Sequence, residues 1–389
     1  MKNPFTAASQ PFSFNPDASR ISDYPNPDHL PDAARWLLAK EGQRRFFNGL
    51  SWYQIFCRTC LQQDQEPTFL YLSSPRGQVT LPLLTPLGRP GCRLSEKRLG
   101  QHSCMSMTNY QTAYYAPISD LPAEDLPAAL EQLARHLKTR GLSVIDFNNL
   151  DSAIPANAAL SGAFERAGFK VHNYDDEPVV FEQVEGLSYQ DYLAKRSSNL
   201  RKNIKRRRRQ IEKVGKVDFV LKKDPDAIEP LIGDYQKVQA ASWKRPEVHC
   251  NHVPDLIRTA AQNGHLRLGL LYLDDQPVAT DLTFLADGRA TSKKAHYDQA
   301  MRNHHVGDVL TSFMFEHLLD VDNVKTIEPG KTAVSYKLKW TVDQRPMNGF
   351  VAFDSRTLKG QSWRLRFQAA RRTRSLLSTI KSKIVTSGG

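Results

Sequence analysis

The sequence predicts a mixed α/β protein built from two lobes, each a twisted mixed sheet flanked by helices. Runs typical of strands alternate along the chain with amphipathic helical runs, which favours layered sheets and helices. The order of elements in the first half (helices, a hairpin, then helix and strand) is broadly repeated in the second half. The chain has 389 residues, which is too long for one small hydrophobic core and suggests two domains.

Composition and charge divide the chain into four expected segments. These are a flexible leader (1–30), a first lobe (31–185), a second lobe (186–354) and a basic amphipathic tail (355–389). The leader is rich in Pro, Ser and Asn and lacks the continuous apolar core of a secretion signal. No window approaches the roughly 18 to 20 apolar residues that a membrane span needs. We therefore expect a cytoplasmic protein.

Periodicity assigns the elements of the first lobe. A helical region is followed by a hairpin, an amphipathic helix with leucines at helical spacing and a short buried strand. In chain order these occupy Pro31 to Leu61, Thr68 to Leu84, Asp125 to Arg140 and Leu142 to Asn148. A further helix end and two strands are expected before residue 185, so the lobe should contain a mixed, helix-flanked sheet.

The second lobe opens with a long helix and continues as alternating strands and helices. The expected helices and strands are Tyr189 to Val214, Lys216 to Lys222, Pro225 to Trp243, Pro254 to Asn263, and Leu266 to Leu273. Two strands then flank the turn signal Asp287-Gly288, namely Val278 to Leu285 and Arg289 to Tyr297. A helix from Val309 and a last strand, Gly349 to Asp354, complete the lobe.

The net charge of +12 is concentrated in Lys195 to Lys223 and in the tail. Within the first of these segments, one helical face carries Leu200, Ile204, Ile211 and Val214, which predicts a surface helix with a buried stripe. Its arginine face could contact an acidic partner such as a phosphate, a carrier protein or a lipid headgroup. Nucleic acid is not expected, because aromatic side chains for base stacking are absent from this helix.

The tail mixes apolar and basic side chains and contains no acidic residue. Trp363, Leu365 and Phe367 stand among many arginines and lysines. This pattern fits a helix lying on an anionic membrane surface, at the inner face of the membrane. A helix packed back on the domain fits it equally well.

A basic loop precedes the helix that begins near Val309. The free N–H groups at a helix start and the helix dipole both favour a bound phosphate. The loop and helix start therefore form a candidate phosphate site, with Arg302 supplying a fork of donors. Its members are Arg302, His304, His305, Val306, Gly307, Asp308 and Val309. A solvated Arg302 and a Gly307 that only permits the turn are the plainer alternative.

Five segments of the second half occur in an order that resembles a known family. They are SSNLRKNIKRRRRQIEKVG, SWK at Ser242, DQPVATDLTF, SKKAHYDQAMRNHHVGDVL and SYKLKWT at Ser335. The chain resembles GNAT-superfamily acetyltransferases of the CelD (cellulose-biosynthesis-type) group, which is distantly similar to FemAB-like aminoacyltransferases. The resemblance implies two GNAT-like lobes, an acyl-CoA donor held at the loop described above, and a functional Tyr336-Lys337 pair.

Acyl transfer from a thioester needs a base for the acceptor, a stabilised carbonyl oxygen and a proton for the departing thiolate. Asp281 and Glu328 on expected strands are candidate bases, and His296 could take a proton near neutral pH. Tyr336 could protonate the thiolate, and Lys337 could stabilise the thioester oxygen or bind a phosphate. For His296 a structural role is the alternative, and for Tyr336 and Lys337 an interdomain contact.

We therefore expect an acyltransferase that uses acyl-CoA, or an acyl carrier protein, and an unidentified amine or hydroxyl acceptor. The acceptor would belong to an envelope, polysaccharide, lipid or secondary-metabolite pathway. The alternatives are a FemAB-like aminoacyl-tRNA-dependent transferase and a non-catalytic binding module. No metal is expected, because Cys57-x-x-Cys60 lacks a second pair and His249, Cys250 and His252 lack a fourth ligand at standard spacing.

Overall fold

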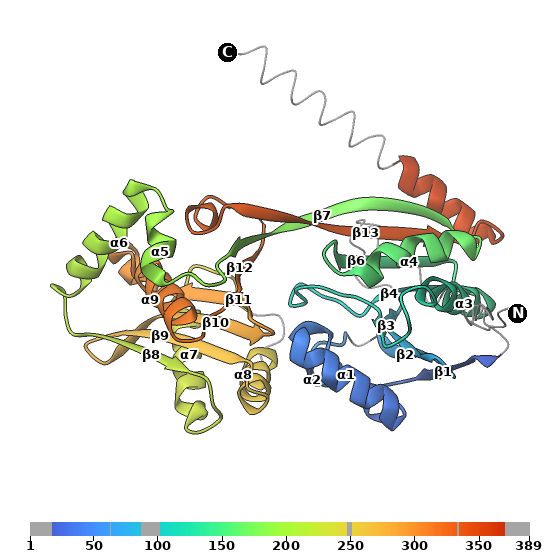
Figure 1. The fold of residues 1–389 in the computed structure, drawn as a ribbon, viewed down its shortest axis with the longest axis horizontal. Coiled ribbons are helices and arrows are strands. Elements are labelled where there is room, and N and C mark those ends of the chain that lie inside the picture. The colour runs from blue at the N-terminus through green and yellow to red at the C-terminus, as the bar shows by residue number, and fades with distance from the viewer. Residues whose placement is uncertain (1–17, 63, 87–101, 247–250, 333, 370–389) are drawn as a thin grey trace, which may run out of the picture.

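The computed structural model describes residues 18–62, 64–86, 102–246, 251–332 and 334–369. Within this part of the chain, two lobes lie side by side and share one continuous mixed sheet (Figure 1). The strand order is β1-β2-β3-β4-β6-β13-β7-β12-β11-β10-β9-β8, with β5 paired to β3. The prediction of a mixed α/β fold with two helix-flanked lobes is confirmed.

In the first lobe, an antiparallel hairpin and a parallel strand pair form the sheet, and helices cover both faces. Its strands are β1 (Arg20–Tyr24), β2 (Glu66–Ser74), β3 (Gly77–Thr85), β4 (Ser103–Ser106), β5 (Ile118–Ser119), β6 (Val144–Asp151) and β7 (Lys170–Gln183). Its helices are α1 (Asp32–Arg44), α2 (Leu50–Thr59), α3 (Leu126–Thr139) and α4 (Pro155–Arg166). The leucines predicted at helical spacing in α3 are buried.

The second lobe contains most of the predicted elements in the predicted order. Its helices are α5 (Tyr189–Ala194), α6 (Ser198–Ile211), α7 (Ile228–Ala241), α8 (His252–Gln262) and α9 (Val306–Asp320). Its strands are β8 (Val217–Lys222), β9 (Leu266–Leu273), β10 (Gln276–Ala286), β11 (Arg289–Tyr297) and β12 (Thr326–Lys331). The long helix expected from Tyr189 is two helices, because Ser197 caps a new start with a hydrogen bond from the Leu200 N–H.

Two long strands join the lobes. The last strand, β13 (Asp343–Phe353), leaves the second lobe and inserts between β6 and β7 of the first. The 14-residue β7 pairs with β13 along most of its length and with β12 at its end. The boundary expected at residue 354 is therefore a boundary along the sequence, whereas in space β13 belongs to the first lobe.

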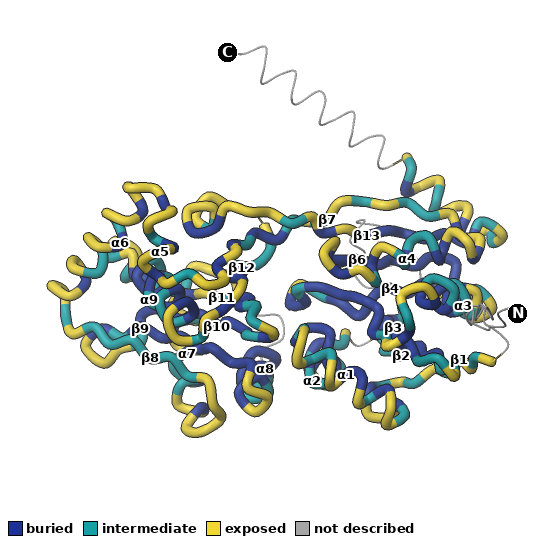
Figure 2. Tube along the Cα trace, in the orientation of Figure 1, coloured by how far each residue is buried: buried dark blue, intermediate teal, exposed yellow. Residues whose placement is uncertain are grey.

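Helices pack on both faces of the second lobe's sheet, and the burial pattern follows this layering (Figure 2). Leu268 and Leu270 of β9 contact the core on the α7 and α8 side, while Leu271 lies in the core below α9. A methyl group added to Gly269 would lie 2.3 Å from the Met314 sulfur. The absence of a side chain at Gly269 thus lets α9 lie close to the sheet.

The described part of the tail is a helix over residues 358–369. Trp363 and Phe367 are buried, and Phe367 lies against Phe353 of β13, with 5.7 Å between ring centroids. These two residues pack on the protein, whereas Leu365 is exposed. Residues 1–17 of the expected leader and 370–389 of the tail lie outside the described residues. Among the described helices, none is both long and apolar enough to cross a membrane.

Candidate active site

The parallel strands β11 and β12 separate after a short paired stretch. They pair only from Arg289 to Thr291 and from Thr326 to Glu328. On its other edge β12 pairs with β7, at Thr326 and Ile327 and again at Gly330 and Lys331, so only its pairing with β11 stops. The separation leaves a gap in the sheet, covered on one side by α9.

A β-bulge in β11 determines which of its side chains face this gap. The register with β10 shifts between Leu282 and Thr283, so Lys293 has no directly opposed partner in β10. As a result Ser292 and Ala295 both line the pocket under α9. His296 lies on the other face and packs edge-on against Tyr235 of α7, at 5.6 Å between ring centroids. The structure therefore separates His296 from the other candidate catalytic residues.

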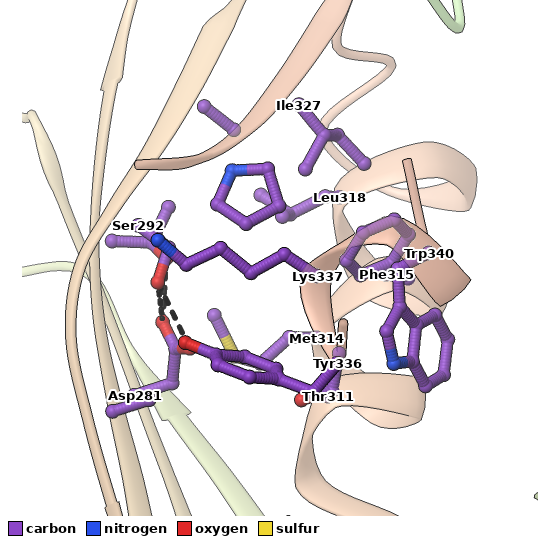
Figure 3. Close-up of a pocket in the computed structure, with 14 residues that line it drawn as sticks. Asp281, Ser292, Thr311, Met314, Phe315, Leu318, Ile327, Tyr336, Lys337 and Trp340 are labelled. Atoms are coloured by element: carbon purple, nitrogen blue, oxygen red, sulfur yellow. Dashed lines mark hydrogen bonds between the residues drawn. The ribbon is translucent and has the colours of Figure 1, made fainter. Parts of the chain in front are cut away.

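The pocket under α9 has a polar mouth and an apolar interior (Figure 3). Its free volume is small, about 60 Å³. The polar side chains at the mouth are those of Asp281, Ser292, Tyr336 and Lys337. The apolar interior is formed by Ala290, Met314, Phe315, Leu318, Ile327 and Trp340. Such a combination is typical of ligand pockets, in which a few polar groups orient a largely apolar ligand.

Asp281 lies at the mouth as a buried carboxylate held by hydroxyl groups. It accepts hydrogen bonds from Thr283 at 2.6 Å and from Ser292 at 3.1 and 3.2 Å. Burial raises the pKa of Asp281, and these hydrogen bonds and the charge of Lys244 partly offset the increase. A carboxylate with a raised pKa is a better proton acceptor than an exposed one, which suits a general base.

Tyr336 and Lys337 reach the same mouth from the loop after β12. Although Tyr336 is half exposed, its hydroxyl points toward Asp281 (Figure 3). Burial of that hydroxyl and the negative charge of Asp281 raise the pKa of Tyr336. The Lys337 amine donates to the backbone carbonyl of Lys331. Burial, reinforced by the positive charge of Lys244, lowers the pKa of Lys337 to about 8.

A second, polar cavity lies between the lobes, next to this pocket. The two share Ser292, Pro329 and Lys337 as lining residues. Its free volume is about 400 Å³. The first lobe contributes Tyr110 and Asn149 among others, and the second lobe contributes Lys293. A molecule in this cavity could thus contact Lys337 from the side opposite the apolar pocket.

Glu328 lies in this polar cavity and is held by two arginines. Its carboxylate accepts from Arg345 at 2.7 Å and lies 3.3 Å from Arg289. The same two arginines also pair with Asp151 of β6 in the first lobe. Both lobes contribute to this buried network. Glu328 therefore connects the lobes and does not lie at the mouth of the pocket.

The predicted phosphate loop begins α9 as expected. His305 has a left-handed backbone, with φ of 55°, whereas Gly307 does not. A methyl group at Gly307 would lie 3.4 Å from the Tyr297 ring, an ordinary contact. The backbone therefore does not require glycine here. Instead, Gly307 leaves the surface around the Val306 and Gly307 N–H groups open to a close ligand.

Positive charge from two other segments surrounds this helix start. Partial burial, followed by the charges of Arg207, Arg206 and Lys339, lowers the pKa of His305. Asp308 in the first turn forms an ion pair with Arg207, which compensates its negative charge. Arg302 is exposed, His304 is half buried, and Val306 and Val309 are buried. Of the predicted loop residues, the polar side chains of Arg302, His304 and His305 are therefore accessible to a phosphate.

The arginine-rich helix α6 has a divided role. Arg207 and Arg208 face α9, where Arg208 contacts Ser312 at 2.8 Å and Glu316 at 2.7 Å. Leu200, Ile204 and Ile211 form the buried stripe that the sequence predicts. The prediction that Val214 continues this stripe is wrong, because Val214 follows the end of the helix and is exposed. The remaining cations are exposed along the outer face, namely Arg201, Lys202, Lys205, Arg206, Arg209 and Lys213.

Sequence reasoning missed Ser292 and Thr311 as site residues. Ser292 orients Asp281, and Thr311 lines the pocket one turn after Gly307, to whose carbonyl its hydroxyl donates at 2.9 Å. Strand alternation alone could have placed Ser292 on the same face as Ala290. No sequence signal marks the bulge at Lys293 that brings Ala295 to that face as well.

Comparisons with known proteins agree with this geometry. Residues 198–338 match a family model described as an acetyltransferase (GNAT) domain. A search of the curated proteins gave no match.

Solved structures with similar folds cover most of the chain. The structure of FemX has a TM-score of 0.56 at 9% identity and covers 89% of this chain and 100% of its own. The C-terminal domain of a protein from Agrobacterium fabrum, provisionally named a lysylphosphatidylglycerol synthetase, has a TM-score of 0.52 at 13% identity. It covers 84% of this chain and 93% of its own. At these identities the likeness concerns the fold: the chain has a GNAT fold, and residues 198–338 are similar to the acetyltransferase (GNAT) domain.

Proposed function

We propose that this protein transfers an acyl group from acyl-CoA to an amine or hydroxyl acceptor. The observation that carries the proposal is the meeting of two cavities at Lys337, one apolar and one polar. An acyl thioester would enter the first along α9, and an acceptor would enter the second between the lobes. The acceptor pathway expected from the CelD-type resemblance, in envelope, polysaccharide, lipid or secondary metabolism, belongs to this proposal.

The donor would bind with its pyrophosphate at the start of α9. The N–H groups of Val306 and Gly307 and the helix dipole favour an anion there. The side chains of Arg302, His304 and His305 would surround the same phosphates, with Arg206 close to His305. Asp308 and Val309 would contribute backbone at the helix start rather than side chains, because Asp308 is paired and Val309 is buried.

The catalytic groups would be Asp281, Tyr336 and Lys337. Asp281 would take the proton from the attacking amine or hydroxyl, while the Lys337 ammonium stabilises charge on the thioester oxygen. As the new C–N or C–O bond forms and the C–S bond breaks, Tyr336 would give its proton to the leaving thiolate. Because the Tyr336 hydroxyl faces Asp281, the proton held by Asp281 could then return to Tyr336 (Figure 3).

Two other candidates have different roles in this proposal. Glu328 would hold the lobes together through Arg289 and Arg345, since both arginines bind its carboxylate. His296 would be structural, because it faces α7 rather than the pocket. Neither residue would exchange a proton with the acceptor.

A second candidate function rests on the exposed cations of α6. They would bind a donor carried on a macromolecule, either an acyl carrier protein or an aminoacyl-tRNA, next to the helix start of α9. The loss of binding between 50 and 200 mM salt would separate these cases, because a polyanion with six or more phosphate contacts loses about 10³-fold in affinity. The tail would add a peripheral contact with anionic membrane from the cytoplasmic side.

The donor can be identified directly. Native mass spectrometry of the purified protein should show a co-purified CoA or acyl-CoA, and calorimetry should show saturable binding of acetyl-CoA. Gly307→Trp should abolish that binding while Gly307→Ala retains it, because only the larger side chain fills the surface where the phosphates would lie. Absence of CoA binding by the unmodified protein would overturn the proposal.

A further inference from the structure

We propose that the apolar interior of the pocket under α9 is an acyl-chain site, and that the preferred donor carries a hydrocarbon acyl group longer than acetyl. This inference rests on the proposed function and names the donor class within it. The evidence is the shape and chemistry of the pocket beyond its polar mouth.

The pocket extends well past the catalytic groups. Its lining runs along α9 from Thr311 to Leu318, which are seven positions or about 10 Å of helix apart. At the near end Thr311 lies one turn from the phosphate loop. At the far end Leu318 lies opposite Ala290 and Ile327, in the stretch where β11 and β12 are still paired. The space thus continues beneath α9 beyond the point where the strands separate.

The far end is apolar on every side that the structure describes. Figure 3 shows Phe315, Leu318 and Trp340 on the side of the pocket away from Asp281 and Ser292. All three are at most 4% exposed, as are Ala290 and Ile327. The ring of Phe315 packs on Trp340 with 5.0 Å between centroids. Hydrocarbon is the ligand chemistry that such a lining stabilises.

An aminoacyl group fits this site poorly. Its α-ammonium would need an acidic or hydrogen-bonding partner, since an unpaired charge in an apolar site costs several kcal/mol. The far-end lining consists of Ala290, Phe315, Leu318, Ile327 and Trp340 and contains no carboxylate. Asp281 lies at the mouth, so an aminoacyl donor could use it only by leaving the apolar interior empty.

The size of Ala290 controls the depth of this site. Its methyl group is the smallest side chain among the far-end lining residues, and it lies on β11 directly before Thr291 and Ser292. Ala290 is fully buried and packs in one cluster with Phe315 and Leu318, so a larger side chain at 290 would take up the small free space between β11 and α9. Shortening Leu318 on the opposite wall would instead deepen the site.

The experiment measures dissociation constants by calorimetry for CoA and for acetyl-, butyryl-, hexanoyl- and octanoyl-CoA. For the unmodified protein each added methylene should tighten binding about fourfold until the site is full, since a buried CH₂ is worth roughly 0.8 kcal/mol. Ala290→Leu should remove this gain while leaving the affinity for acetyl-CoA within twofold. Leu318→Ala should shift the best chain length upward.

Leu319→Ala is the matched control. Leu319 is on the same helix and is equally buried, at 2% exposure, but it does not line the pocket. It should lower stability as much as Leu318→Ala without changing chain-length preference. Equal affinity for all acyl-CoAs in the unmodified protein would overturn the inference, as would Ala290→Leu weakening free CoA as much as octanoyl-CoA. Either result would leave the proposed function intact, whereas no binding of any CoA would reject that function.

Discussion

Each lobe contains a short pair of parallel strands joined through a helix, and in the second lobe a pocket lies beside the paired strands. In the first lobe β4 and β6 pair in parallel from Ser103 to Met105 and from Val144 to Asp146. In the second lobe β11 and β12 pair in parallel over the same number of residues. A helix follows the first strand of each pair, α3 in one lobe and α9 in the other. The lobes therefore differ in what occupies the space beside the paired strands.

The first lobe fills that space with its own chain. Tyr115 forms an isolated parallel bridge with Leu150 of β6, is fully buried and packs on Phe147. Thr108 donates to Asn148 in the same region. The start of α3 is likewise occupied, because Asp125 at the N-cap is buried and paired with Arg76. The corresponding positions in the second lobe are a pocket and an accessible helix start. Under the proposed function, we therefore expect a catalytic site in the second lobe and none in the described part of the first.

The largest expected difference between the lobes is in catalysis. Asp281→Asn should reduce kcat by about 10² to 10⁴-fold, because it removes the proposed general base. Asp146→Asn in the first lobe should leave kcat unchanged, although Asp146 is a buried carboxylate of the equivalent strand pair. Initial rates with a thiol reagent would measure both. A large loss with Asp146→Asn would show that the first lobe also takes part in the chemistry.

For the free energy of unfolding, we expect the large effect in the first lobe. Tyr115→Ala should reduce the free energy of unfolding by about 3 to 5 kcal/mol, because it empties the space that the first lobe fills. Tyr115→Phe should be neutral or stabilising, since among the described residues the Tyr115 hydroxyl is buried without a hydrogen-bond partner. Urea denaturation would compare the two variants. Equal losses for Ala and Phe would mean that the hydroxyl, rather than the ring, stabilises this region.

Donor affinity should depend on one helix start only. Replacing Arg302 with Ala should weaken acyl-CoA binding about tenfold, through loss of charge-assisted hydrogen bonds to phosphate. Arg76→Met at the start of α3 should cost stability but not donor affinity. Calorimetry measures both dissociation constants, and a weakened donor in Arg76→Met would indicate a second phosphate site.

The pH dependence should come from the second lobe. The proposed mechanism requires a protonated Lys337, so activity should fall as pH rises through about 8, while the raised pKa of Asp281, the proposed base, should set the acidic limit. Lys337→Arg should move the alkaline limit upward. Rate profiles from pH 5 to 10 would show this, and an unchanged alkaline limit in Lys337→Arg would exclude Lys337 as the titrating group.

The smallest expected effect concerns the stability of the same lysine. Its folded-state pKa is lowered, so between about 8 and its ordinary value the unfolded chain binds more protons and stability rises with pH. Below pH 8 the buried charge is a cost. Lys337→Met should therefore stabilise the protein by about 1 kcal/mol at pH 7, after allowance for partial exposure, while abolishing transfer. A destabilised Lys337→Met would show that its contact with the Lys331 carbonyl outweighs the charge burial.

Sequence reasoning reached the fold because periodicity and turn chemistry are local. The hairpin turning at Gly77, the helix α3 and the strand–loop–helix from Arg289 through Val309 could all be read from nearby residues. The loop at Gly307 could be proposed as a phosphate site for the same reason. The sequence could not predict that this loop lies next to Arg206, because that proximity depends on the packing of α6 against α9.

The sequence predicted less well which of the polar strand residues lie together in the candidate site. Asp281, Glu328 and His296 are all polar residues on strands, and alternation does not indicate which of them share a cavity. The difference arises from the bulge at Lys293, which leaves His296 facing α7, and from Arg345, which reaches Glu328 from a strand of the other lobe. Both are tertiary effects that a single sequence does not show.

The position of β13 has a consequence for biosynthesis. Because β6 and β7 are joined only through β13, the first lobe's sheet stays incomplete until residues 343–353 have been synthesised. Long-range pairing of this kind is slow and leaves strand edges exposed in the meantime. The first lobe should therefore not fold on the ribosome ahead of the second. Expressed alone, residues 18–185 should aggregate through the open edges of β6 and β7, and a separately added β13 peptide should reduce that aggregation.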